Sequence, residues 1–182
     1  MLRPFCPIQP RGPDRRFRIN VDLIEMSLKL GEPQIEIIRQ HGKRDYPSEC
    51  CGMLLGRAEN DRKFVSEAVP LRNLRQDPGR SQAILPLAAT GTESERNRFL
   101  IDPVDQIRVE KDARARGLDV VGYYHSHPDH PAQPSLYDRD HAWPWYSYVI
   151  ISVERGEPKA LTSWVLRDDR TQFDPEEVEV SG

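Results

Sequence analysis

Two histidines separated by a single residue carry the clearest chemical signal in this sequence. His125-Ser126-His127 directly follows Val120–Tyr124, an apolar run whose β-branched and aromatic residues are typical of a buried strand. Side chains two apart in a strand point to the same face, so both imidazoles can converge on one ion. Pro128 then ends the strand. Taken alone, a His-x-His pair is more often two solvated loop residues than a metal site.

A carboxylate follows at a spacing that could complete such a site. Ser135-Leu136-Tyr137-Asp138 predicts the start of a helix, with Ser135 as the N-cap and Asp138 in the first turn. Presented back toward the strand end, this carboxylate would be a third ligand. Two imidazoles, one carboxylate and a water make up a hydrolytic zinc site. A helix cap with its reciprocal acid explains Ser135 and Asp138 equally well on their own, so the joint spacing of the two motifs is what favours a metal.

At full spacing the pattern resembles the JAMM motif of the MPN+ metallopeptidases. The matching residues are His125-Ser126-His127-Pro128, the six residues 129–134, and Ser135-Leu136-Tyr137-Asp138. The family also carries an upstream glutamate followed by Cys-Gly, and here Glu49-Cys50-Cys51-Gly52 precedes an apolar strand. The stretch Phe99–Pro103 is similar as well, and the resemblance covers the chain from Ser27 to its C-terminus.

The resemblance implies both a fold and a set of residue roles. The fold class would be α/β, a single MPN-like (cytidine-deaminase-like) domain with a mixed central β-sheet flanked by helices. One zinc ion per chain would be bound by His125, His127 and Asp138. Glu49 would be the general base that takes a proton from the attacking water and returns it to the leaving amine. Ser135 would help to hold the oxyanion of the tetrahedral intermediate.

The activity implied is that of a zinc-dependent peptidase or isopeptidase, cutting an amide bond after the C-terminal Gly-Gly of a ubiquitin-like or sulfur-carrier protein. One alternative is a non-catalytic MPN interaction scaffold, but all ligand positions and Glu49 are intact. Another is a DNA-repair-associated relative that shares the His-x-His-Pro motif. A net charge of −3 and the Glu-x-Cys-Gly segment favour the peptidase over this DNA-linked relative.

Hydrophobic periodicity and turn residues predict the elements that position these groups. A short edge strand is expected at Ser27–Leu30, and a helix from Pro33 that Gly42 closes. A second helix is capped by Asp102 and ends before Gly117. Further strands are expected at Cys51–Leu55, Lys63–Leu71, Tyr148–Val153 and Ala160–Leu166, with a last edge strand at Glu177–Val180.

Several other residues near the motifs have plainer interpretations. His130 and His141 match no ligand position, so solvated or supporting roles are expected. Cys50 and Cys51 are predicted to pack in the core rather than to bind metal. Core packing is also expected, ahead of a substrate groove, for three aromatic residues: Trp143, Trp145 and Tyr146.

Composition sets the remaining expectations. The 182 residues fit one domain, with residues 1–26 as a flexible, basic, proline-rich extension and 27–182 as the metallopeptidase domain. The polar stretch 74–97 predicts a long loop or lid that affects substrate access. A mean hydropathy of −0.68 and a pI of about 6.0 argue against membrane and nucleic-acid partners. Three cysteines and no secretory signal favour a cytoplasmic enzyme.

Overall fold

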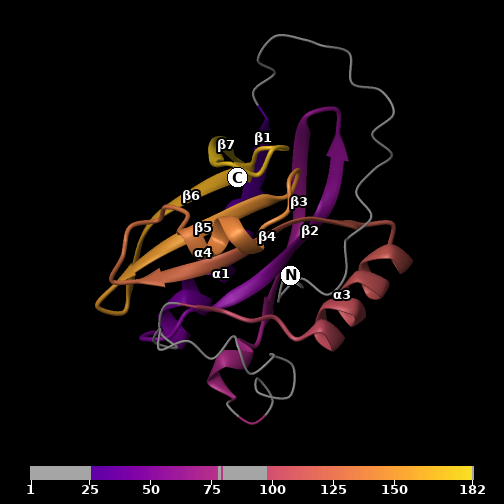
Figure 1. The fold of residues 1–182 in the computed structure, drawn as a ribbon. Coiled ribbons are helices and arrows are strands. Elements are labelled where there is room, and N and C mark those ends of the chain that lie inside the picture. Colours follow the sequence, from indigo (N-terminus) through magenta and orange to yellow (C-terminus); the bar gives the residue numbers. More distant parts are fainter. Residues whose placement is uncertain (1–25, 78, 80–97, 182) are drawn as a thin grey trace.

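The computed structural model describes residues 26–77, 79 and 98–181, shown as a coloured ribbon in Figure 1. The predicted extension 1–26 and the predicted loop 74–97 therefore lie mostly outside the described residues. The elements, in chain order, are β1 (Ser27–Gly31), α1 (Glu32–Asp45), β2 (Cys51–Glu59), β3 (Arg62–Leu71), the 3-10 turn η1 (Leu74–Gln76), α3 (Pro103–Ala115), β4 (Asp119–Pro128), α4 (Leu136–His141), β5 (Ser147–Glu154), β6 (Glu157–Leu166) and β7 (Phe173–Ser181).

Within the described residues the strands form one mixed sheet that closes into a barrel, in the order β1-β3-β2-β4-β5-β6-β7. The pairs β1–β3, β1–β7 and β4–β5 are parallel, and the others are antiparallel. The prediction of edge strands at Ser27–Leu30 and Glu177–Val180 is therefore wrong. Strand β1 bonds to both β3 and β7, and its Leu28 and Leu30 are fully buried, so these two segments close the sheet.

Alternation along β2 and β4 divides the core between two faces. Leu54 and Tyr124 belong to a cluster that includes Ile35 and Ile38 of α1. Their neighbours Met53, Leu55 and Tyr123 belong to a second cluster, which includes Val109 and Ala113 of α3. Helix α3 contacts β4 and stands beside the strands in Figure 1. The two strands that carry the chemistry are thus held from both sides.

Helix α1 runs one turn further than predicted, through Gly42 to Asp45. A Cβ atom on Gly42 would lie 2.9 Å from Cγ2 of Val153 in β5, so this glycine lets the helix approach the sheet closely instead of ending the helix. Strand β4 is also longer than the apolar run Val120–Tyr124, because it continues through both histidines to Pro128.

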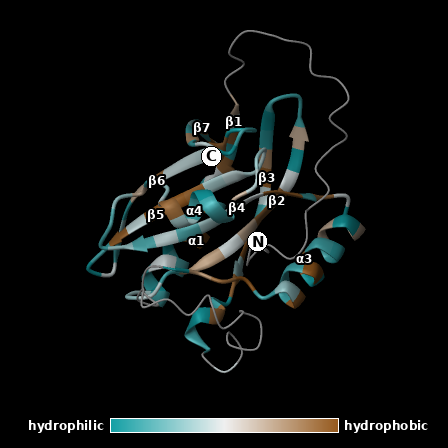
Figure 2. Ribbon diagram, in the orientation of Figure 1, coloured by the Kyte–Doolittle hydropathy of each residue, from teal (hydrophilic) through white to brown (hydrophobic). Residues whose placement is uncertain are grey.

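Figure 2 shows that α3 is hydrophilic over most of its length, with only isolated hydrophobic positions. Val109 and Ala113 are its buried apolar residues, whereas Val104 in its first turn is exposed. Among the described residues, no helix combines the length and the apolar character needed to cross a membrane.

Candidate metal centre and catalytic site

Strand β4 presents its two histidines on one face. It pairs in parallel with β5, with His125 opposite Ile150 and His127 opposite Ser152. The intervening Ser126 points the other way, where its hydroxyl accepts a hydrogen bond of 2.9 Å from the backbone N–H of Cys50. Because β4 pairs with β5 at both positions, the sheet sets the direction of the two imidazoles.

Asp138 is brought to these histidines by the predicted helix start. Ser135 is the N-cap of α4, and the two residues form a capping box: the Ser135 hydroxyl accepts from the Asp138 N–H, and Asp138 Oδ2 accepts from the Ser135 N–H at 2.7 Å. The cap therefore orients the carboxylate as well as starting the helix. Asp138 is almost fully buried although α4 is short.

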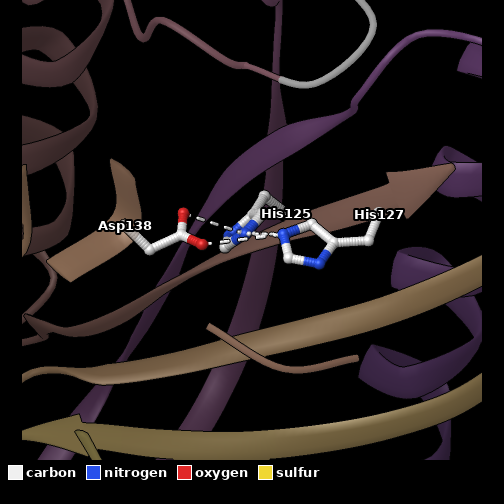
Figure 3. A group of neighbouring side chains, drawn as sticks. All are labelled: His125, His127 and Asp138. Atoms are coloured by element: carbon white, nitrogen blue, oxygen red, sulfur yellow. Dashed lines mark hydrogen bonds and ion pairs between the residues drawn. The ribbon is translucent and has the colours of Figure 1, made fainter. Parts of the chain in front are cut away.

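The three predicted ligands converge, as Figure 3 shows. His125 Nε2 lies 3.0 Å from His127 Nε2 and 3.2 Å from Asp138 Oδ1, and His127 Nε2 lies 3.6 Å from Asp138 Oδ2. Zinc binds such ligands tetrahedrally at about 2.0–2.1 Å, which corresponds to donor–donor separations of about 3.3 Å. The nitrogen–nitrogen separation and the two nitrogen–oxygen separations, one to each Asp138 oxygen, are comparable with this value, so the three side chains lie close enough together to hold one zinc ion.

Contacts with neighbouring residues orient both imidazoles so that their Nε2 atoms face the Asp138 carboxylate. His127 Nδ1 lies 3.0 Å from the Pro131 carbonyl oxygen, which can only accept, so Nδ1 carries the proton and Nε2 offers its lone pair. Phe99 stacks on the His125 ring with centroids 4.7 Å apart. Together these contacts fix the orientation of both rings.

Burial and neighbouring charge shift the pKa values of two of the predicted ligands, His125 and Asp138. Burial lowers the pKa of His125, against the raising effect of the Asp138 carboxylate, and so favours the neutral imidazole. Burial alone would raise the pKa of Asp138, but the adjacent His125 and the hydrogen bond from Ser135 hold it well below the usual range. A neutral imidazole and an ionised carboxylate are the forms that bind zinc.

Glu49 lies next to the metal ligands because of the β2–β4 register. Cys51 pairs with His125, and Ser126 N–H donates to the Cys50 carbonyl at 3.1 Å, so Glu49 falls opposite His127. Burial raises the pKa of Glu49 well above its usual value, the Asp138 charge adds to the rise, and Arg98 opposes it. A carboxyl group with raised proton affinity suits a residue that accepts and releases a proton.

Close packing explains why the β2–β4 register needs a glycine at Gly52 of the Glu-x-Cys-Gly segment. A Cβ atom there would lie 2.3 Å from the Tyr124 ring and 2.5 Å from the Val69 carbonyl oxygen. Any larger residue would push β2 away from β4. Glu49 would then move away from the histidines.

Ser135 is near the three predicted ligands, but its hydroxyl is already engaged. It donates to Asp138 Oδ2 at 2.7 Å while accepting from the Asp138 N–H. Its observed contacts are those of a cap that orients a ligand. A role in binding the oxyanion requires the hydroxyl proton to turn away from Asp138.

A cleft borders both Glu49 and one of the predicted ligands, His127. It is lined by Glu49, His127, Pro128, His130, Pro131, Gln133, Pro134 and Ser135. His130 is exposed on this cleft, and His141 hydrogen-bonds the Tyr137 carbonyl oxygen through Nδ1, so neither joins the three predicted ligands. Asp138 also borders an aromatic cavity, whose walls include Phe99, Tyr137 and Trp143.

The remaining predictions for this region concern packing. Cys50 and Cys51 are fully buried free thiols, as predicted, and burial raises the pKa of Cys50 to about 12. Tyr146 is a core residue, and Trp143 and Trp145 pack against the same cluster. No sequence motif marks the buried side chain of Asn73, which donates to the Glu49 carbonyl at 2.9 Å.

Comparison with known proteins places this geometry among related chains. Residues 31–167 match the family described as prokaryotic homologs of the JAB domain. The chain is 32% identical to a desampylase of Haloferax volcanii over 115 residues, 63% of this chain and 69% of that one. It is 25% identical over 159 residues to the CysO-cysteine peptidase of Mycobacterium tuberculosis, 82% of this chain and 95% of that one. A solution structure of a protein from Desulfitobacterium hafniense superposes with a TM-score of 0.66 at 31% identity, covering 85% of this chain and 92% of that one.

Proposed function

Because the chain belongs to the family of prokaryotic homologs of the JAB domain, we propose that it is a zinc-dependent peptidase or isopeptidase. We further propose that it hydrolyses the amide bond after the C-terminal Gly-Gly of a ubiquitin-like or sulfur-carrier protein. It would act in the cytoplasm, where the buried free thiols of Cys50 and Cys51 stay reduced.

One observation carries this proposal. Two imidazoles and a carboxylate bring one ligand atom each within 4.8 Å of one another, and Glu49 borders the same cleft as His127. His125, His127 and Asp138 would hold one zinc ion. Bound there, zinc polarises the scissile carbonyl and lowers the pKa of the attacking water.

Glu49 performs the proton transfers in this scheme. Its carboxylate takes a proton from the attacking water, and the raised proton affinity of its buried site favours holding that proton. The same carboxyl then delivers the proton to the leaving nitrogen as the carbon–nitrogen bond breaks. Ser135 contributes a hydroxyl donor to the oxyanion once its proton turns from Asp138.

The cleft favours glycine beside the scissile bond. Pro128, Pro131 and Pro134 form part of its wall, and proline rings are rigid. Residues without a Cβ atom can pass such a wall where larger side chains would collide. The names of the two relatives, a desampylase and a CysO-cysteine peptidase, support the same class of substrate.

The substrate is tested with a carrier protein extended beyond its Gly-Gly, incubated with the zinc-loaded enzyme and followed by intact mass. We expect a product that ends at Gly-Gly. A carrier with Gly-Gly replaced by Ala-Ala is the matched control and should stay uncut. An intact extension, with a general peptide library cut instead, would indicate a broad-specificity metallopeptidase. No cleavage of either substrate would favour the scaffold.

Glu49 is tested separately. Glu49→Gln should retain the fold and the zinc but reduce the rate by about two to four orders of magnitude, as expected for loss of a general base. Glu110→Gln is the matched control, because Glu110 is also buried but hydrogen-bonds Gln106 on α3. A Glu49→Gln variant as active as the parent would remove Glu49 from the mechanism.

A further inference from the structure

Asn73 is fully buried at the point where the chain leaves β3, and its side chain makes four hydrogen bonds. Its Nδ2 donates to the carbonyl oxygens of Glu49 at 2.9 Å and Arg98 at 3.2 Å. Its Oδ1 accepts from the N–H groups of Arg75 and Leu100, both at 3.0 Å. One amide thereby uses both of its donors and both of its acceptor positions.

The segments tied together in this way include the general base and one wall of the metal site. Glu49 sits just before β2, and Asn73 holds its carbonyl oxygen from outside the sheet. Asn73 also hydrogen-bonds the segment 98–100. In that segment Phe99 stacks on His125, and the Arg98 charge lowers the pKa of Glu49. Asn73 itself lines neither the cleft nor the aromatic cavity.

We propose that Asn73 is a positioning residue for Glu49, because its side-chain amide fixes the Glu49 backbone to the 98–100 segment and so holds the carboxylate beside the metal ligands. This inference rests on the proposed role of Glu49 as general base. The geometry of the bonds identifies the chemistry needed. Two carbonyl oxygens need hydrogen-bond donors and two N–H groups need an acceptor. Among side chains as short as that of Asn73, only a carboxamide supplies both.

Two variants distinguish the hydrogen bonds that the Asn73 Nδ2 donates from those that its Oδ1 accepts. Asn73→Ala removes all four bonds. Asn73→Asp keeps the acceptor for Leu100 and Arg75 but places a second oxygen against the carbonyls of Glu49 and Arg98. If Asn73→Ala does not hold zinc, Asn73→Asp carries the test. Ser163→Ala is the matched control, because it removes one buried hydrogen bond, to Glu176, in another part of the barrel.

The measurement is kcat and KM per zinc-loaded molecule on the extended carrier. We expect Asn73→Asp to lower kcat by about tenfold to a hundredfold, with KM within about twofold of the parent, since a group displaced from its productive geometry loses rate rather than binding. Ser163→Ala should leave kcat unchanged. A kcat for both Asn73 variants within about twofold of the parent would overturn the proposal.

A double-mutant cycle shows whether Asn73 acts through Glu49. In the Glu49→Gln background, where the general base is already gone, Asn73→Asp should change the residual rate by less than about twofold. An equal loss in both backgrounds would contradict positioning of Glu49. If Glu49→Gln alone has the same kcat as the parent, the proposed role of Glu49 as general base is wrong. That result is distinct from equal losses of kcat on Asn73→Asp in both backgrounds, which would contradict only the positioning role of Asn73.

Discussion

Two buried clusters of charged residues lie in this small barrel, and they are built differently. In the first, Lys63 donates to Glu176 at 3.1 Å and to the Ser147 hydroxyl at 2.9 Å, and Ser163 donates to the other Glu176 oxygen. Lys63 also sits over the Trp145 ring. The second cluster contains two carboxyl groups, Glu49 and Asp138, together with the lone pairs of His125 and His127.

The difference separates a structural cluster from a binding one. Lys63 and Glu176 neutralise each other, and their polar atoms are satisfied by the chain itself. At the second cluster, acceptor atoms of His125, His127 and Asp138 converge on one point, while the nearby Arg98 charge acts on Glu49. A point bounded by buried acceptor atoms suits an external cation. The second cluster is therefore the one expected to bind a metal.

The largest expected effect is at the ligands. His125→Ala, His127→Ala or Asp138→Ala should reduce bound zinc from one per chain to a small fraction, and lower activity by more than about a thousandfold. Metal analysis of protein purified without chelator checks the first result, and carrier cleavage checks the second. A full complement of zinc in all three variants would place the metal elsewhere.

Breaking the first cluster should cost stability rather than metal. Lys63→Met leaves Glu176 buried without its cation, which should lower the free energy of unfolding by about 3–5 kcal/mol. Zinc content and kcat per folded molecule should stay at the parent values. Urea unfolding, with metal analysis of the folded fraction, measures both.

The matched control for that change is the double variant Lys63→Met with Glu176→Gln. Removing both charges should recover more than half of the lost stability, because no unpaired ion is left in the barrel. If the double variant is no more stable than Lys63→Met, charge pairing is not what the cluster contributes.

A smaller effect is expected at Ser135. Ser135→Ala removes the cap of α4 and one hydrogen bond to Asp138, which should cost about 1 kcal/mol and lower kcat by about tenfold. Ser135→Thr keeps the hydroxyl and should recover most of both losses. Zinc affinity measured beside kcat separates the two roles: an unchanged affinity with reduced kcat supports oxyanion binding.

The smallest expected effect concerns the pH dependence of the metal-free protein. Burial raises the pKa of Glu49, so between its usual and its raised pKa the folded state holds a proton that the unfolded chain releases. Stability should therefore fall as pH rises through this window. Glu49→Gln should remove that fall in stability. It should raise Tm by a few degrees at pH 8 and by less at pH 5, because a change of about 1 kcal/mol in the free energy of unfolding shifts Tm by about 2–4 °C in a chain of this size.

This prediction is checked by thermal unfolding in the presence of a chelator. The exposed residue Glu177, changed to Gln, serves as the control and should leave the pH dependence of the parent. A Glu49→Gln variant with the parent's pH dependence would mean that Glu49 is not the buried acid that its environment indicates.

Much of the candidate site could be predicted from local sequence. The two histidines are two apart in a strand, so short-range geometry puts them on one face, and Asp138 is in the first turn after an N-cap that orients its carboxylate. The family resemblance stated from these motifs is confirmed. The assignments of catalytic and ligand roles to individual residues stay predictions.

What the sequence could not indicate depends on long-range pairing. From the sequence alone, Lys63 would be taken for an ordinary surface residue, because its partner Glu176 is 113 positions away. Asn73 stands in a polar turn, and three of the four groups it binds lie on other segments. Closure of the barrel by β1 and β7 was missed for the same reason, because an alternating strand pattern does not tell an edge from a strand paired on both sides.

The most direct test of the account is a zinc-edge anomalous difference map of crystals grown without chelator. The account predicts one strong peak per chain, bounded by His125 Nε2, His127 Nε2 and a carboxylate oxygen of Asp138, within about 2.0–2.2 Å of each. A map without a peak at these three residues, or with its only strong peak at other side chains, would contradict the account.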